Sequence, residues 1–229
     1  MNYGGGQSPA DSGEVEALKF FRDSFDTSKP FTLFDVGAND GEYLSHALDA
    51  LGSDLNAYSF EPQSESYARL DKRFANDPRV KTLKVALGGK VGTAELFSAE
   101  TGDATASLHR NNVFDQTSSE LVQVTTVDQV CADEGIEQID FLKIDTEGNE
   151  MDVLLGASNT IEAGRVSAIQ FEFGDPYINT QYHFIDLWKL LSPRHTIYRI
   201  LRHGLVALDS YSTDLEIYKI ANFICVKRQ

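Results

Sequence analysis

Two short segments of the chain combine residue types that can hold an adenosine. The first, Phe34–Gly41, is an apolar run that ends in a turn containing Gly37 and Gly41. The second, Phe60-Glu61-Pro62, begins about twenty residues after that turn. Glycines let a strand-to-helix turn approach a ligand closely, and an acid that ends the next strand can accept hydrogen bonds from both ribose hydroxyls. The two segments therefore predict a Rossmann-like nucleoside site with Glu61 on the ribose.

The spacing of the glycines separates two cofactors that contain adenosine. A dinucleotide site needs three glycines in G-x-G-x-x-G order, the second of which lets a pyrophosphate come close. This turn has Gly37 and Gly41 alone, and Asp35 and Asp40 add two anions to it. Carboxylates repel a phosphate and attract a sulfonium or an ammonium. We therefore expect S-adenosyl-L-methionine, and NAD in an oxidoreductase is the alternative that Glu61 would tolerate.

A second segment whose residues could do chemistry extends from Ile139 to Glu150. Its first half is typical of a buried strand, and this strand is followed by Asp145, Glu147 and a glycine. Ligands of open α/β sheets bind beyond the carboxyl ends of the strands, so these acids should face the same crevice as Glu61. Methyl transfer from a sulfonium to a hydroxyl is an in-line displacement, which a carboxylate assists by orienting the hydroxyl and removing its proton. Asp145, and after it Glu147, are the predicted catalytic residues.

The acids of this region also suit other roles. Carboxylates near a helix N-terminus satisfy N–H groups that have no partner in the helix, and for Glu150 we favour this structural role. Asp145, Glu147 and Glu172 could supply oxygen ligands of the kind that Mg²⁺ prefers, but their spacing is not diagnostic and metal dependence is left open. Glu172 and His183 are predicted substrate contacts, and for His183 a surface or packing role is the alternative.

Composition limits the class of partner. The chain has 229 residues, of which 41% are hydrophobic, enough for one substantial core. Its formal net charge of −15 disfavours sequence-independent binding to nucleic acid or to an anionic membrane, and no apolar run approaches the length of a membrane span. A small-molecule or glycan substrate fits better, and self-association into a homo-oligomer is left open. The one basic patch, from Arg194 to His203, could meet a phosphate or carboxylate on the substrate.

The cysteines and the N-terminal segment bear on the compartment. Cys131 and Cys225 form neither a metal-binding spacing nor a disulfide framework, which indicates a reducing, cytoplasmic environment. Residues 1–13 are rich in glycine and serine and lack the apolar stretch of a signal peptide, so they are predicted to be a flexible leader.

Strand-like and helix-like segments alternate over residues 14–229 without a linker-like break, which predicts a single domain with one doubly wound α/β sheet. Residues 88–119 form a long polar stretch, and whether it is an ordered lid is left open. Helices are expected over residues 14–26, 42–50, 64–75, 128–134, 150–161 and 183–191. Strands are expected over residues 31–36, 57–61, 80–87, 93–97, 121–127, 141–145, 168–173, 196–199 and 221–226, the last two as an antiparallel hairpin at the sheet edge.

The chain resembles the FkbM family of S-adenosylmethionine-dependent methyltransferases. The order Lys143-Ile144-Asp145-x-Glu147-Gly148-x-Glu150 is the most specific point of likeness. The resemblance implies a three-layer, Rossmann-like class I methyltransferase fold with a mostly parallel seven-stranded sheet whose last strand is antiparallel. It also implies O-methylation of a sugar or a small natural product. The matching segments are Phe34–Gly41, Tyr58–Pro62, Val85–Gly88, Ala106–Leu108, Ile139–Glu150 and Leu154–Ala157.

The resemblance also assigns residues to the cofactor. The glycine turn would surround its methionine part, Glu61 would accept from the ribose, and the strand end at Ala86 would meet the adenine. Plain strand packing is the alternative for Ala86. Ser107 would belong to a loop that closes over the site. The full predicted cofactor set is Asp35, Gly37, Ala38, Asn39, Gly41, Glu61, Pro62, Val85, Ala86, Leu87, Ser107 and Asp145.

Three functions follow from these residues. The leading one is O-methylation of a hydroxyl on a sugar, a glycan or a small natural product. The second is an NAD-dependent oxidoreductase, which the absence of a third glycine disfavours. The third is an inactive module that binds S-adenosyl-L-methionine, which Asp145 and Glu147 argue against, because such a module has no evident use for acids at a strand end.

Overall fold

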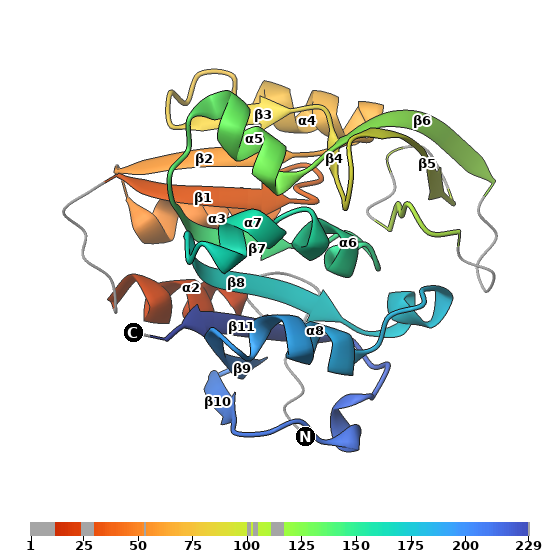
Figure 1. Cartoon of the computed structure of the whole chain (residues 1–229). Helices are drawn as coiled ribbons and strands as arrows, with labels where there is room; N and C mark the ends of the chain where they lie inside the picture. Colours follow the sequence, from red (N-terminus) through yellow and green to blue (C-terminus); the bar gives the residue numbers. More distant parts are fainter. Residues whose placement is uncertain are drawn as a thin grey trace.

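The computed structural model describes residues 12–23, 30–52, 54–99, 102, 105–110 and 117–228. An eight-stranded sheet runs through its centre (Figure 1). The strands of this main sheet are β1 (Phe31–Val36), β2 (Leu55–Phe60), β3 (Val80–Leu83), β7 (Ile139–Ile144), β8 (Val166–Phe173), β9 (His195–Leu201), β10 (Gly204–Leu208) and β11 (Ala221–Lys227).

The order of the strands is β10-β9-β11-β8-β7-β1-β2-β3. The five strands from β8 to β3 are parallel to one another, whereas β11 is antiparallel to both β8 and β9. The carboxyl ends of β1, β2 and β7 therefore meet at one edge of the sheet, where ligands of open α/β sheets bind.

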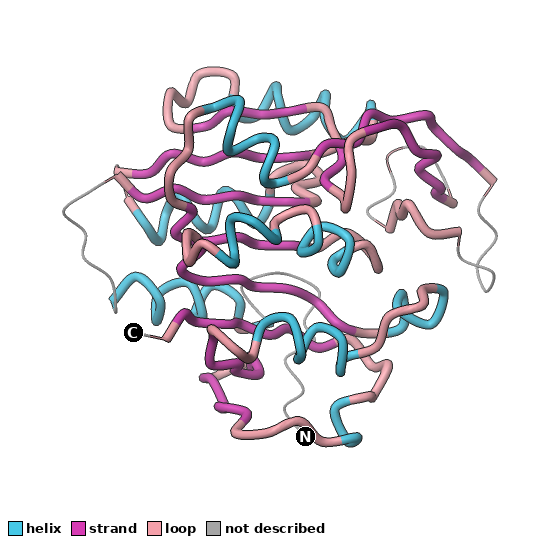
Figure 2. The backbone as a smooth tube through the Cα atoms, viewed as in Figure 1, coloured by secondary structure: helices cyan, strands magenta, loops and turns pink. Residues whose placement is uncertain are grey.

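Helices cover both faces of the main sheet, which gives three layers (Figures 1 and 2). The first three described helices pack on one face and the last four on the other. They are α2 (Glu14–Asp23), α3 (Glu42–Leu51) and α4 (Ser64–Phe74) on the first face, and α5 (Val127–Glu134), α6 (Glu150–Leu155), α7 (Ser158–Glu162) and α8 (Phe184–Leu191) on the second. Two 3-10 helices, η1 (Asp175–Asn179) and η2 (Thr213–Leu215), lie in the C-terminal connections.

The central strands are apolar on both faces because both faces are covered by helices. On β7, Phe141 packs against Phe21 of α2, with ring centroids 5.4 Å apart, and Leu142 belongs to the core beneath α5–α8. Neighbouring residues of a strand point to opposite faces, so one short strand contributes to two cores. These two cores hold the strand ends, and with them the residues of the site, in fixed positions.

A second, three-stranded sheet lies beyond the carboxyl ends of the central strands, at the right of Figure 1. It consists of β4 (Ala86–Leu87), β6 (Ser118–Thr125) and β5 (Gly92–Ser98), in that order. The expected single strand over residues 80–87 is therefore divided between two sheets. The chain leaves the main sheet after Leu83, whose carbonyl accepts a hydrogen bond from the Val85 N–H.

The fold class is confirmed, and apart from the divided strand over residues 80–87 the structure departs from the expected elements in four further places. The main sheet has eight strands because β10, which was not predicted, folds back on β9. The strand pair β9–β11 is antiparallel as expected, but β11 lies inside the sheet rather than at its edge. The expected helix over residues 150–161 is two helices, interrupted at Gly156. A Cβ at Gly156 would lie 2.1 Å from the carbonyl oxygen of Gly88.

The fourth departure concerns the N-terminal segment. Ser12 is 2% exposed and Gly13 packs against Leu201, so these two residues of the predicted leader belong to the packed structure. Residues 1–11 of that prediction lie outside the described residues, as do residues 24–26 of the first expected helix.

The two cysteines, Cys131 and Cys225, are buried and free. None of the helices in the described part of the chain is both long enough and apolar enough to cross a membrane.

Candidate active site

The turn between β1 and α3 is shaped by residues with positive φ. Gly37 has φ +76°, and a Cβ there would lie 1.7 Å from the carbonyl oxygen of Asp145. Asn39 has φ 47°. Gly41 has φ 82° and is the N-cap residue of α3, and a Cβ at this position would lie 2.4 Å from the ring of Phe74. At Gly37, glycine tolerates a positive φ and leaves room for the Asp145 carbonyl oxygen, because it has no Cβ. The contact between the ends of β1 and β7 therefore requires glycine at this position.

Glu61 is fixed by backbone hydrogen bonds at the end of β2. Its Oε2 accepts from the Asn39 N–H at 2.9 Å and its Oε1 accepts from the Gln63 N–H at 2.8 Å. Burial raises the pKa of Glu61, and the hydrogen bonds from Gln63 and Asn39 oppose that shift. Each carboxylate oxygen keeps a further lone pair, so Glu61 can accept two more hydrogen bonds without moving.

A pocket opens at the carboxyl ends of the central strands. About 500 Å³ of space lies between its atoms, open solvent included. The small sheet and the loop that follows β7 both contribute to its lining. The lining residues are Val36, Gly37, Phe60, Glu61, Pro62, Val85, Ala86, Leu87, Leu96, Ala106, Leu108, Asp145, Thr146, Glu147 and Asn149.

The loop after β7 is held by the buried carboxylate of Glu150. This carboxylate accepts hydrogen bonds from the N–H groups of Thr146, at 2.7 Å, and Gly148, at 3.1 Å. The Glu147 backbone has φ 55°, and its carbonyl oxygen accepts a hydrogen bond from Ser107 Oγ at 2.7 Å. The loop is therefore tied to α6 by Glu150 and to the small sheet by Ser107. The side chain of Asp145, which is 39% exposed, is presented at the pocket from this loop.

A buried lysine lies beneath the pocket. Lys143 is 4% exposed, and its Nζ lies 3.4 Å from Asp35 Oδ1, Asp145 Oδ2 and the carbonyl oxygen of Gly37. The same ammonium lies 5.1 Å from the ring centroid of Tyr43. The charges of Asp145 and Asp35 raise the pKa of Lys143 against the effect of its burial, so the side chain is an ammonium that joins the end of β7 to the glycine turn.

The structure brings together most of the residues predicted to hold the cofactor. Eight of the predicted site residues line the pocket: Gly37, Glu61, Pro62, Val85, Ala86, Leu87, Asp145 and Glu147. Four other predicted residues do not line the pocket but lie in or next to the glycine turn. Asp35 is fully buried beneath the turn, Ala38 and Gly41 pack into the core beside it, and Asn39 donates to Glu61. Ser107 lies at the rim, where it bonds to Glu147.

The two predicted substrate contacts do not line the pocket. Glu172 is the penultimate residue of β8 and pairs with Asn222 of β11. Burial, with the charges of Asp145 and Glu147, raises the pKa of Glu172 well above its ordinary value. His183 is exposed, precedes α8 and has its Nδ1 2.6 Å from the hydroxyl of Tyr218. These contacts place His183 in the C-terminal connections, with Tyr218.

The metal alternative is not supported by the arrangement of the acids. Within the described ranges, no group of three or more His, Cys, Asp or Glu side chains is placed to hold a metal ion. Asp145, Glu147 and Glu172 therefore do not form the ligand set that the sequence left open, and we derive no step that needs a metal.

Sequence reasoning missed two side chains of the site. Lys143 was part of the recognised motif, but it was given no role. Asn149, which is 5% exposed, donates from Nδ2 to the carbonyl oxygen of Leu87 at 2.9 Å and so connects the loop after β7 to the pocket wall at Val85–Leu87. A charged residue in an otherwise apolar central strand was the signal for Lys143, because such a residue needs a buried partner.

Known proteins resemble this chain in sequence and in fold. The 2-O-methyltransferase NoeI of Sinorhizobium fredii (strain NBRC 101917 / NGR234) is 24% identical over 184 residues, which are 74% of this chain and 70% of that protein. The fold of methyltransferase FkbM from Methylobacillus flagellatus KT is similar, with a TM-score of 0.55 and 16% identity. That similarity covers 90% of this chain but 47% of the other, so this chain spans about half of its length.

The fold is also similar to that of a SAM dependent methyltransferase from Aquifex aeolicus, with a TM-score of 0.51, 12% identity, and coverage of 97% of this chain and 93% of that one. The model of the methyltransferase FkbM domain family matches residues 35–200, which include the glycine turn, Glu61 and the whole loop after β7. The chain therefore belongs to the FkbM family of methyltransferases.

Proposed function

We propose that this protein transfers a methyl group from S-adenosyl-L-methionine to a hydroxyl oxygen of a sugar, a glycan or a small natural product. One observation carries the proposal: a single pocket is lined by the acids Glu61 and Asp145 together with the apolar segment Val85–Leu87. This lining suits S-adenosyl-L-methionine, whose ribose diol lies between a flat heterocycle at one end and the cationic sulfonium and ammonium at the other.

The residues of the pocket divide the work of holding such a cofactor. Glu61, fixed by the N–H groups of Asn39 and Gln63, has free lone pairs for the ribose hydroxyls. Val85 and Leu87 supply an apolar edge for the adenine, and Asp145 supplies a negative charge. When bound, S-adenosyl-L-methionine supplies an electrophilic methyl group and a thioether leaving group.

Asp145 is the proposed base. As the new oxygen–carbon bond forms and the sulfur–carbon bond breaks, the acceptor hydroxyl must lose its proton, and the Asp145 carboxylate takes it. Lys143, on the buried side of Asp145, leaves the outer face of the carboxylate open to the acceptor. Glu147, at the next bend of the loop, is proposed to orient the acceptor. Glu172 and His183 are kept as proposed outer contacts of a larger acceptor.

O-methylation is favoured over other methyl transfers because the relative NoeI is named a 2-O-methyltransferase. The net charge of −15 favours an acceptor that is small or carries no phosphate backbone.

Calorimetric titration of the purified protein with S-adenosyl-L-methionine, its demethylated product and NAD in parallel tests the cofactor. We expect binding of the first two and not of NAD, followed by methyl transfer in a screen of glycan and natural-product acceptors with and without Mg²⁺. Binding of NAD alone would overturn the proposal. Binding of the first two with no transfer to any hydroxyl acceptor would leave an inactive binding module as the better description.

A further inference from the structure

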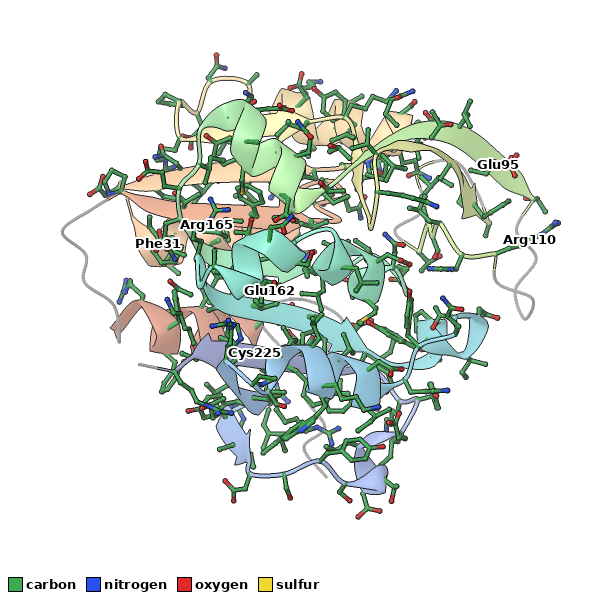
Figure 3. All side chains as sticks on the ribbon, viewed as in Figure 1. Phe31, Glu95, Arg110, Glu162, Arg165 and Cys225 are labelled. Carbon is green, nitrogen blue, oxygen red and sulfur yellow. The ribbon has the colours of Figure 1, made fainter. Side chains whose placement is uncertain are left out.

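A second pocket lies at the opposite edge of the main sheet, where β8 and β9 begin and β11 ends. About 490 Å³ of space lies between its atoms, open solvent included. Its walls are the turn between α7 and β8, the segment Pro193–His195 and the segment Lys227–Arg228. Figure 3 labels Glu162 and Arg165, which flank that turn. The length of the strands separates this pocket from the candidate active site.

The lining of this second pocket is basic. Arg194, Lys227 and Arg228 contribute to it, and no acidic residue does. This is unusual in a chain that has 35 acidic and 20 basic side chains. The sequence predicted one basic patch over residues 194–203, and this prediction is only partly right. Arg194 and His195 line the second pocket together with the end of β11, whereas Arg199 and Arg202 do not line it. Pairing of His195 with Lys227 in the sheet is the cause.

Two of the cations are fixed by uncharged groups. Lys227 Nζ donates to the carbonyl oxygen of Gly164 at 2.6 Å. Arg228 Nη2 donates to the carbonyl oxygens of Ser192, at 2.5 Å, and His195, at 3.0 Å. A backbone carbonyl orients a cation without neutralising its charge, and each side chain keeps further N–H donors. The pocket is thus preorganised and still positively charged.

No acid cancels this charge within the described ranges. No carboxylate there lies within the 4.0 Å of an ion pair from Arg194, Lys227 or Arg228. His195, which is 1% exposed, forms part of the wall. Burial lowers the pKa of His195, and the charges of Lys227 and Arg228 lower it further, so this side chain experiences the positive field without adding to it.

We propose that this basic pocket binds the phosphate group of a small soluble ligand. Two guanidinium groups and one ammonium can surround a phosphate, whose two charges and several acceptor oxygens use more of these donors than a carboxylate would. Ile161, Val166 and Pro193 offer an apolar surface to the rest of the ligand. The site does not depend on the function proposed for the first pocket, and it goes beyond that function.

Calorimetric titration of the full chain with inorganic phosphate and with pyrophosphate tests the site, at constant ionic strength and with sodium chloride as the blank. We expect saturable binding, tighter for pyrophosphate, that weakens at least tenfold in Arg194→Ala/Arg228→Ala. Arg194→Ala alone, which disturbs no hydrogen bond of the described residues, should weaken binding about threefold to fivefold. This single variant keeps the test valid if the double variant is unstable.

The matched control is Lys72→Ala/Lys90→Ala, which removes the same charge from two exposed lysines that line neither pocket. It should bind pyrophosphate as the wild type does. An equal loss in this control would overturn the site. So would the absence of saturable binding by the wild type up to about 10 mM phosphate or pyrophosphate, which is about tenfold above a millimolar dissociation constant. Sedimentation with vesicles containing phosphatidic acid separates the two sources of phosphate, and vesicle binding without pyrophosphate binding would overturn the soluble ligand.

Discussion

Lys143 Nζ lies 3.4 Å from Asp145 Oδ2, so the proposed base of the reaction rests on a buried ammonium. The same ammonium lies 3.4 Å from Asp35 Oδ1 and 3.4 Å from the carbonyl oxygen of Gly37. Lys143 therefore anchors both the end of β7 and the glycine turn after β1. Replacing it should displace the pocket residues Gly37 and Asp145 on these two segments.

Replacement of Lys143 by Met should weaken binding of S-adenosyl-L-methionine at least tenfold. The variant loses the anchor and leaves Asp35 buried without its cation, which costs about 3–5 kcal/mol of stability in comparable buried pairs. Calorimetry and thermal unfolding measure the two effects. Gln170→Met is the matched control, because Gln170 pairs with Lys143 in the sheet and is 1% exposed, but its side chain bonds to Glu14 rather than to a pocket residue. A similar loss of binding in both variants would contradict the role of Lys143.

Replacement of Glu61 by Ala should weaken binding of S-adenosyl-L-methionine by about 10-fold to 100-fold. The variant loses the hydrogen bonds that a charged carboxylate makes to two hydroxyls, each worth about 1.5–3 kcal/mol at most. Titration calorimetry gives the dissociation constant. Glu65→Ala is the control, since Glu65 is an exposed acid in the first turn of α4 and does not line the pocket. Unchanged binding in Glu61→Ala would exclude the ribose contact.

Asp145→Asn should reduce the rate of methyl transfer much more than it weakens cofactor binding. The amide keeps the shape of the side chain but cannot take up the acceptor proton, and general-base catalysis contributes about 10²-fold to 10⁴-fold. The comparison is between kcat, measured with the acceptor found by the screen, and the dissociation constant of the cofactor. Equal losses in both quantities would show that Asp145 holds the cofactor and is not the base.

Gly37→Ala should disrupt both folding and cofactor binding. A Cβ at this position would lie 1.7 Å from the carbonyl oxygen of Asp145, so the two loops must separate. Gly52→Ala is an informative control, because Gly52 also has a positive φ, +81°, but nothing lies within 4 Å of the added carbon. Gly52→Ala should lower stability by about 1–3 kcal/mol, the cost of a backbone conformation that is largely restricted to glycine, and leave binding unchanged. The difference between the two melting temperatures measures the close contact.

Glu172→Gln should stabilise the protein at alkaline pH. Burial and the nearby charges of Asp145 and Glu147 raise the pKa of Glu172 above its ordinary value of 4.5. The folded state therefore holds this proton more tightly than the unfolded state, and the resulting stability is complete below pH 4.5 and is lost as the pH rises through the folded-state pKa. The amide does not ionise, so the variant should melt higher than the wild type at pH 9 and gain less at pH 6. A gain that is equal at both pH values would contradict the shift.

The features that the sequence predicted best are local in the chain. The glycine turn and Glu61 are defined by neighbouring residues, and each lies where the periodicity places it. The role of Lys143 depends on the pairing of β7 with β1, which brings Lys143 to Gly37, 106 positions earlier in the chain, and no local pattern carries that information. The environment of His183 has the same cause, because its partner Tyr218 follows 35 residues later.

Two features of the strands were not predicted from the sequence: a change of sheet within an uninterrupted strand-like pattern, and one short strand. Residues 80–87 read as one strand because no glycine or proline interrupts them, yet the chain changes sheets between Leu83 and Ala86. β10 has only five residues, exposed at Val206, so it lacks the apolar alternation of a buried strand. The change of sheet shapes the pocket, since the lining segment Val85–Leu87 joins the two sheets.

The position of β11 determines when the main sheet can be completed during biosynthesis. β8 and β9 are made first, but they do not pair with each other, because β11 is inserted between them. Until residues 221–227 leave the ribosome, the β9–β10 hairpin has no place in the sheet, and the apolar edge of β8 is unprotected. Non-local pairing of this kind slows folding and exposes strand edges to other chains. Chaperone demand on this protein should therefore be concentrated in the interval between the synthesis of β9 and that of β11.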